Sequence, residues 1–315
     1  MALRILFLGT PEFAVPTLQR LAAGPHIIVA VVTTPDKAAN RGLRLQPSPV
    51  KQAALSLGLP VLQPNRLDEP HFLNTVTELQ PDIGVVVAFR KLPRALWSLP
   101  KMGSINLHAS LLPQYRGAAP IQRAIMAGES TTGLTTFFLD DELDTGQILL
   151  QQVVPIREDD TGGSLHDRMK ILGAELVSTT LDLLEAGKCT PKPQPQWPDL
   201  KKAPKIKPEE LLINFHQPVH AVHNHVRALA PVPAAYTIVN HERLKILRAS
   251  TVLCAPMLPA GSPCTDNSGR LLFACTDGYL VALEVQRPGR RPLPVDAFLR
   301  GWNYRSLLPV ISVAQ

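Results

Sequence analysis

The first half of the chain alternates short apolar runs with stretches of helical periodicity. Three runs, residues 3–9, 27–33 and 82–88, are apolar and rich in β-branched residues, as parallel strands buried on both faces are. The stretches between them predict helices at residues 11–21, 52–57 and 70–79. This alternation predicts an α/β fold with a Rossmann-like parallel sheet, whose strands are joined by right-handed crossovers.

Further elements of both kinds follow in the next hundred residues. Runs rich in β-forming residues predict strands at 104–108, 133–139 and 147–156. Residues 119–128 contain Pro120 near their start and end at Gly128, which is typical of a short helix. Residues 163–186 place apolar side chains at spacings of three and four, so they predict a long amphipathic helix.

A proline-rich segment then divides the chain. Residues 190–204 hold five prolines, which restrict the backbone and remove amide donors, so we expect neither helix nor sheet there. After a predicted short strand and helix within 208–229, short strands with turn residues between them are expected at 235–240, 243–250, 270–275 and 279–286. We therefore predict an α/β domain over 1–189, a linker over 190–207, and a smaller, mostly-β domain resembling an OB-like barrel over 208–315.

The positive charge of the chain lies almost entirely in its last third. The formal net charge is +6, yet residues 1–199 are close to neutral. Residues 200–315 combine 14 lysines and arginines with only 7 acidic residues. A basic domain beside a neutral one suits a polyanionic partner, although an inert basic surface would have the same composition.

One predicted strand carries two side chains suited to acyl-group chemistry. In the segment 104–113 (SINLHASLLP), Asn106 and His108 are two residues apart, so both project from the same face. They lie near a strand end, where α/β sheets place ligands. An amide can donate to a carbonyl oxygen and an imidazole can carry a proton, and acyl transfer requires both. Taken alone, such a pair more often means a core asparagine and a surface histidine.

An acidic cluster follows about thirty residues later. Asp140, Asp141, Glu142 and Asp144 fall within five residues, just before Gly146. Like-charge repulsion makes such a cluster costly, so it is either solvated, bound to a metal, or arranged to place one carboxylate beside a histidine. The spacing differs from that of a calcium-binding loop, so we expect no metal. Taken alone, the cluster fits a solvated loop best.

Together the two motifs resemble the folate-dependent formyltransferase family. Members share an asparagine, a histidine and an aspartate in the contexts N-x-H-x-S-L-L-P and L-D-T-G, which both occur here. Within the family, the chain is most similar to the branch that formylates methionyl-tRNA. That similarity rests on residues 9–14 and 115–122, on the basic loop at 34–51, and on 227–231 and 298–301 in the tail.

The resemblance implies a reaction and a set of site residues. The expected reaction moves a formyl group from 10-formyltetrahydrofolate to the free amino group of initiator methionyl-tRNA, for translation initiation. Asn106 and His108 would stabilise the oxyanion, and Asp144 would orient His108 and hold a water that relays the proton. Residues expected to bind the folate are Ser110, Leu111, Leu112, Pro113, Arg90, Leu92 and Asp140. Residues expected to bind the tRNA are Arg41, Lys37, Arg44 and Lys51.

Three positions depart from the pattern of that family. Phe89-Arg90 stands where Tyr-Gly is common, so contacts to the pterin are expected to differ in detail. Glu142 stands where a glycine is common before L-D-T-G, which leaves the loop backbone less free. Ala234 stands where a glycine is usual after P-x-P. None of these departures removes Asn106, His108 or Asp144.

Two other functions remain open from the sequence. The first is a formyltransferase acting on a small amine, such as an amino-sugar nucleotide or glycinamide ribonucleotide. The basic loop at 34–51 argues against it, because a small sugar has no use for such a loop. The second is an RNA-binding protein with an inactive formyltransferase domain, against which the intact Asn106, His108 and Asp144 argue.

The start of the chain and its cysteines bear on where the protein acts. The apolar run at residues 2–8 meets Gly9 and Pro11 at once and lacks a cleavage site, so we interpret it as a strand. No stretch is long and apolar enough to predict a membrane helix. The four cysteines show no zinc spacing and are expected to be free thiols. We expect a cytoplasmic monomer.

Overall fold

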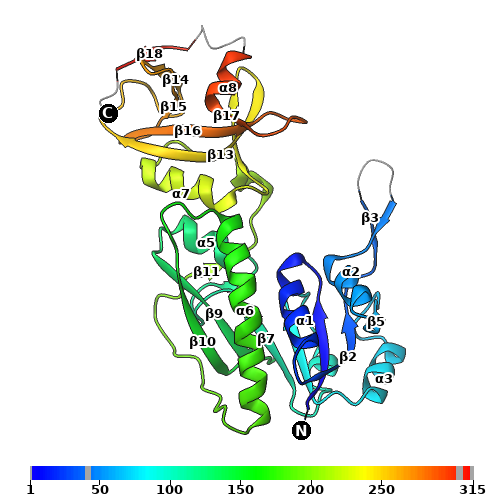
Figure 1. Ribbon diagram of the computed structural model, residues 1–315. Coiled ribbons are helices and arrows are strands. Elements are labelled where there is room, and N and C mark those ends of the chain that lie inside the picture. The colour runs from blue at the N-terminus through cyan, green and yellow to red at the C-terminus, as the bar shows by residue number, and fades with distance from the viewer. Residues whose placement is uncertain (1, 40–43, 303–307, 313–315) are drawn as a thin grey trace. The chain divides into compact units, whose positions relative to one another are not determined.

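The computed structural model describes residues 2–39, 44–302 and 308–312. Internal contacts divide it into two compact units, and each is described by itself (Figure 1). The first unit comprises Met1–Pro120, Thr131–Pro155 and His166–Ala203. The second comprises Ile121–Ser130, Ile156–Leu165 and Pro204–Gln315. Within the described residues, no helix has the length and apolar character that a membrane crossing requires.

Seven strands form the main sheet of the first unit, in the order β10-β9-β7-β6-β1-β2-β5. Their bounds are β1 (Arg4–Gly9), β2 (Ile27–Val32), β5 (Val61–Leu62), β6 (Ile83–Val87), β7 (Ser104–His108), β9 (Thr131–Phe138) and β10 (Ile148–Pro155). From β1 the chain moves outward to β2 and β5, then returns to β6 and β7 on the other side of β1. The strand order therefore reverses between β1 and β6, and ligands of α/β sheets bind at such a point.

The Rossmann-like α/β class is confirmed, but the sheet is not parallel throughout. Strands β5, β2, β1, β6 and β7 run parallel, whereas β9 runs antiparallel to β7 and β10 antiparallel to β9. The parallel arrangement therefore does not extend to these two strands. A short connection of nine residues joins β9 to β10, and such a connection permits only antiparallel pairing.

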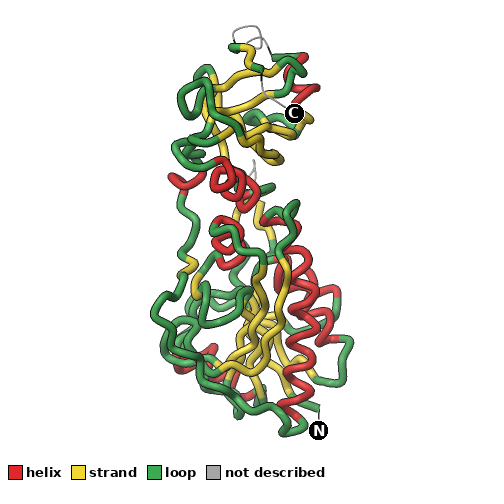
Figure 2. Tube along the Cα trace, turned by 90° about the vertical axis from the view of Figure 1, so that its left-hand side faces the viewer, coloured by secondary structure: helices red, strands yellow, loops and turns green. Residues whose placement is uncertain are grey.

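Helices cover both faces of this sheet. On one face, Leu6 and Leu8 of β1 pack with Phe72 of α3 (Pro70–Glu78) and Leu96 of α4 (Arg94–Trp97). The long helix α6 (Gly162–Glu185) runs beside the sheet (Figures 1 and 2). The hydroxyl groups of Thr180 on α6 and Thr136 on β9 are 2.9 Å apart. The remaining helices of the first unit are η1 (Glu12–Ala14), α1 (Val15–Ala22) and α2 (Pro49–Ser56), whereas α5 (Pro120–Met126) lies in the second unit from Ile121 onward.

The basic region at 34–51 differs from the long loop expected for it. Strands β3 (Lys37–Ala39) and β4 (Arg44–Gln46) pair as an antiparallel hairpin. Helix α2 begins at Pro49 rather than at residue 52, because the Ser48 hydroxyl caps it by accepting from the Lys51 N–H at 3.0 Å. Only residues 40–43, which include Arg41, lie outside the described part of this region.

The proline-rich segment also differs from its prediction, because it takes part in sheet pairing. Strand β11 (Lys202–Ala203) pairs in parallel with β8 (Arg116–Gly117). Lys192 exchanges two main-chain hydrogen bonds with Ile148, at 2.7 and 2.8 Å. Both pairings use residues between the prolines, whose amide groups remain available as donors. Up to Ala203 the segment therefore belongs to the first unit.

The second unit is built mainly from one antiparallel sheet, which confirms a smaller, mostly-β domain. Its strand order is β12-β13-β16-β15-β14-β18, with β17 paired to β16. The bounds are β12 (Ala235–Val239), β13 (Glu242–Leu253), β14 (Pro263–Asp266), β15 (Leu271–Ala274), β16 (Gly278–Gln286), β17 (Leu293–Pro294) and β18 (Val310–Ile311). Its helices are η2 (Pro208–Leu211), α7 (Val219–Leu229) and α8 (Val295–Arg300). Val222 and Val226 of α7 pack with Leu280 and Phe273 in its core.

Candidate active site

Strand β7 presents its polar side chains on one face at its carboxyl end. Leu107 contacts Gly173 of α6, so its neighbours Asn106 and His108 project from the opposite face. His108 is the last residue of the strand and is buried, whereas Asn106 is partly exposed. Among the described residues, no hydrogen-bond partner engages the Asn106 side chain, so its amide is available to a ligand.

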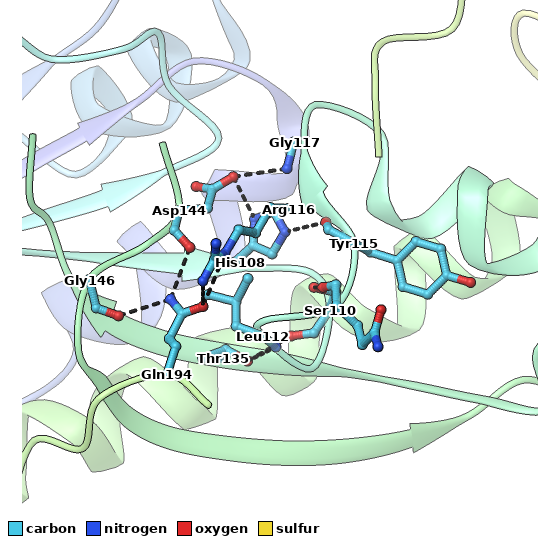
Figure 3. Close-up of polar contacts among 11 residues, drawn as sticks. His108, Ser110, Leu112, Tyr115, Arg116, Gly117, Thr135, Asp144, Gly146 and Gln194 are labelled. Carbon is cyan, nitrogen blue, oxygen red and sulfur yellow. Dashed lines mark hydrogen bonds and ion pairs between the residues drawn. The ribbon is translucent and has the colours of Figure 1, made fainter. Parts of the chain in front are cut away.

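The imidazole of His108 lies between a carbonyl group and a carboxylate (Figure 3). Its Nε2 is 2.9 Å from the main-chain oxygen of Tyr115. Because a carbonyl oxygen only accepts, Nε2 carries a hydrogen and donates it. On the other side, Nδ1 is 3.8 Å from Oδ2 of Asp144, which is too long for a direct hydrogen bond. The nitrogen that can exchange a proton with a substrate is therefore Nδ1.

Asp144 lies on the connection between β9 and β10 and is almost fully buried. Its side chain is 8% exposed, and that of His108 is 7% exposed. Oδ2 accepts the N–H of Gly117 at 3.0 Å. The backbone of Asp144 has φ of +58°, in the left-handed region that non-glycine residues seldom adopt. Two other acidic residues of this connection have different partners. Asp140 Oδ1 accepts a hydrogen bond from the Thr145 hydroxyl at 2.7 Å, and Oδ2 of Asp141 is 3.5 Å from Nη1 of the exposed Arg94.

The segment predicted to bind the folate is held in place from β9 and β10. The Thr135 hydroxyl donates to the Ser110 oxygen at 2.7 Å and accepts the Leu112 N–H at 3.1 Å. Gln151 donates to the Leu112 oxygen at 2.9 Å. The buried Ser110 hydroxyl donates to the main-chain oxygen of Gln114, the residue directly after the segment. These hydrogen bonds fix the main chain of the segment against the two strands.

The side chains of this segment differ in what they contact. Leu112 is buried with Phe137 and Ile148, and Leu111 covers Gly133 so closely that a Cβ there would overlap it. Pro113, which follows a cis peptide bond, is also buried. A ligand at this segment would therefore meet its main chain and the edges of these side chains.

Three other predicted folate residues have partners elsewhere in the first unit. Arg90 is exposed and donates to the main-chain oxygens of Pro64 and Asn65, at 2.8 and 2.9 Å. Leu92 is buried in the core cluster on the α3 face of the sheet. Asp140 accepts the Glu142 N–H as well as the Thr145 hydroxyl. The structure brings together His108, Asp144 and the segment 110–113, but it gives no contact from Arg90 or Leu92 to them.

Three of the four residues predicted to bind tRNA lie on the β3–β4 hairpin and the start of α2. Lys37 and Arg44 occupy the paired strands, and Arg41 lies outside the described residues. Lys51 points to Asp36, with Nζ 2.6 Å from Oδ2, and it holds the pKa of that carboxyl below its ordinary value. Lys51 is thus engaged in an ion pair at the base of the hairpin.

The comparisons with known proteins identify the family. A model of the formyl transferase family matches residues 3–181, and a model of the formyl transferase C-terminal domain matches residues 205–303. Proteins named methionyl-tRNA formyltransferase are 43% identical over 309 residues in Bacteroides fragilis and 44% identical over 301 residues in Moorella thermoacetica. These matches cover 96% and 95% of this chain, and 95% and 96% of the relatives. The chain belongs to the formyl transferase family.

Solved structures share the fold of this formyl transferase at lower identity. An N-formyltransferase from Helicobacter canadensis, in complex with folinic acid and dTDP-3-aminofucose, has a TM-score of 0.66 and 19% identity. It covers 90% of this chain, and the match spans 99% of its own. HypX from Aquifex aeolicus in complex with tetrahydrofolic acid has a TM-score of 0.63 and 20% identity. That match spans 99% of this chain and 49% of HypX.

Reasoning from the sequence missed several groups that hold the site of this formyl transferase. The Tyr115 oxygen and the Gly117 N–H are main-chain groups, so no side chain identifies them. Thr135 and Gln151 lie on predicted strands, and a richness in β-forming residues does not indicate which side chains bond to a neighbouring loop. Gln194 donates to the main chain of the Asp144 connection, and it lies in a segment that was interpreted as a free linker. Among the described residues, no cluster of three or more potential metal ligands occurs.

Proposed function

We propose that this formyl transferase moves the formyl group of 10-formyltetrahydrofolate to the α-amino group of initiator methionyl-tRNA. The observation that carries the proposal is the buried His108–Asp144 pair at the end of β7, with the partly exposed amide of Asn106 on the same strand. The relatives named methionyl-tRNA formyltransferase, which match nearly the whole chain, support this acceptor.

Asn106 and His108 would divide the chemistry between them. As the amine attacks, the formyl oxygen gains negative charge, and the Asn106 amide donates a hydrogen bond to it. An atom that bridges Nδ1 of His108 and Oδ2 of Asp144 fits the 3.8 Å separation of these two acceptors. The attacking amine nitrogen, or one water molecule bonded to it, would occupy this bridging position. We infer that Nδ1 takes the proton that this nitrogen loses.

Asp144 would stabilise the cationic form of His108. Once Nδ1 is protonated, the imidazolium donates to Tyr115 through Nε2 and faces the carboxylate through Nδ1. The same proton then passes to the folate nitrogen N10, which keeps the electron pair of the broken C–N bond. No residue of the chain becomes acylated. The segment 110–113 beside His108 would align the folate with the amine, and such alignment lowers the barrier further.

The tRNA would contact basic residues in both units. On the hairpin we assign this role to residues 37, 41 and 44, with Lys51 supporting its base. In the chain after residue 200, the basic residues would bind phosphates without reading sequence: Lys201, Lys202, Lys205, Lys207, Arg287, Arg290 and Arg291. We propose a monomer that works in the cytoplasm, where charged tRNA and reduced folate occur. Light scattering of the protein in solution tests the monomer.

Formylation of defined acceptors tests the proposal. The protein is incubated with 10-formyltetrahydrofolate and, in parallel, with methionyl-tRNA, an amino-sugar nucleotide or glycinamide ribonucleotide. We expect formyl-methionyl-tRNA and no other product. Formylation of the sugar nucleotide alone would establish the small-amine alternative. Binding of tRNA without any formyl transfer would establish an inactive RNA-binding protein.

A further inference from the structure

Gln194 connects the proline-rich segment to the catalytic loop. Its Nε2 donates to the main-chain oxygens of Asp144 and Gly146, both at 2.9 Å (Figure 3). These two carbonyl groups lie on either side of Thr145. One half-buried amide therefore closes the turn that carries Asp144.

The oxygen of the Gln194 amide accepts hydrogen bonds from a residue of β8. Its Oε1 accepts from Nε and Nη2 of Arg116, at 3.1 and 2.6 Å. The next residue, Gly117, donates its N–H to Oδ2 of Asp144. The side chain of Asp144 is thus tied to β8 directly, and its main chain is tied to β8 through Gln194.

Asp144 needs this support because of its backbone conformation. A φ of +58° is uncommon for a residue with a Cβ, and the hydrogen bonds to the carbonyl group and the carboxylate of Asp144 hold it in that conformation. Without a partner for its carbonyl, the turn can relax toward a commoner conformation. Such a relaxation would move Oδ2 away from Nδ1 of His108, while leaving β7 and the segment 110–113 in place.

We propose that Gln194 is a positioning residue for Asp144 in the formyl-transfer reaction. It acts through the main chain of the loop and does not touch the substrates. The inference rests on the proposed function, because Asp144 matters for rate only if the chain transfers formyl groups. The expected signature is a loss in kcat without a loss in substrate binding, since a misplacement of about 1 Å can lower a rate by about 10²-fold.

The test compares three variants of the full chain in steady-state and single-turnover formylation of methionyl-tRNA. Gln194→Ala should lower kcat by about 10- to 100-fold, with KM for both substrates within about twofold of wild type. Gln194→Glu keeps an oxygen for Arg116 but sets a carboxylate against two carbonyl oxygens, so it should be at least as slow. Gln196→Ala, at an exposed glutamine of the same segment, should behave as wild type. Thermal unfolding verifies that each variant is folded.

A double-mutant cycle separates positioning of Asp144 from a general structural role. In an Asp144→Ala background, Gln194→Ala should cost no further rate, because its effect passes through that side chain. The inference is overturned if Gln194→Ala keeps wild-type kcat, if Gln194→Glu restores it, or if the full loss persists in the Asp144→Ala background. A wild-type protein that formylates no acceptor would instead overturn the proposed function.

Discussion

Replacing Asp144 by asparagine isolates the effect of one buried charge. The two side chains have nearly the same shape, and the amide oxygen of asparagine can still accept the Gly117 N–H. In the native protein, Oδ2 of Asp144 is 3.8 Å from Nδ1 of His108, and both side chains are less than a tenth exposed. Two unit charges at this distance interact by about 4 kcal/mol at an effective dielectric constant of about 20.

This interaction exists only after His108 has taken up the proton, so it stabilises the transition state more than the bound substrates. Since about 1.4 kcal/mol corresponds to a tenfold change in rate, Asp144→Asn should lower kcat by about 10³-fold. KM for the folate and for methionyl-tRNA should stay nearly unchanged. Single-turnover formylation with enzyme in excess measures the slow chemical step directly.

The matched control is Asp141→Asn, three residues away on the same connection. Asp141 is 64% exposed and paired at 3.5 Å with an arginine that is 75% exposed, so its charge is screened and its removal should leave kcat unchanged. If folded Asp144→Asn kept more than a tenth of the wild-type kcat, the carboxylate would not be stabilising a cationic His108, and the proton route through Nδ1 would be refuted.

Three further predictions concern other parts of the chain. Gly117→Ala should lower both Tm and kcat, because its Cβ would overlap the Ala203 oxygen at φ of +127°; calorimetry and the formylation assay check this. Arg41→Ala should weaken tRNA binding and reduce the slope of log Kd against log salt by about 1, as measured by titration. Arg123 holds the pKa of Glu210 below its ordinary value of 4.5. This pair therefore stabilises the fold above pH 4.5 and its contribution disappears as pH falls through the lowered pKa. Glu210→Gln should reduce Tm at pH 7, and the difference from wild type should shrink in unfolding scans at pH 4 and below.

The strands were predictable where burial alone decides them. β1, β2 and β6 are central strands with both faces covered, so each is an uninterrupted apolar run in the sequence. The direction of β9 was not predictable in the same way. Its apolar pattern is compatible with either direction relative to β7, and the short connection to β10 fixes only that β9 and β10 run antiparallel to each other. Likewise the start of α2 depends on the Ser48 cap and not on periodicity.

The side chains proposed for catalysis could be selected from the sequence because amide and imidazole groups suit acyl transfer. The spacing of Asn106 and His108 predicts that they share a strand face. The family resemblance, and not the spacing, indicates Asp144 as their partner. The spacing could not show that Nε2 of His108 is occupied by the Tyr115 oxygen, because that partner is a main-chain group in a loop. The assignment of Nδ1 as the proton acceptor therefore required the structure.

The main-chain groups that bond to His108 and Asp144 show how much of the chain is needed to hold these two side chains. Tyr115 holds His108 and Gly117 holds Asp144, and both belong to a segment that is itself held by residues 201–203. The Tyr115 N–H donates to the Lys201 oxygen at 2.6 Å, and β8 pairs with β11. The polypeptide that holds the His108 and Asp144 side chains, which we propose to be catalytic, thus extends through the proline-rich segment to Ala203. Prolines in that segment suppress helix and long strands, and this leaves single residues such as Lys192 and Gln194 free to bind along the first unit. A composition typical of a linker here belongs to a segment that supports the active site.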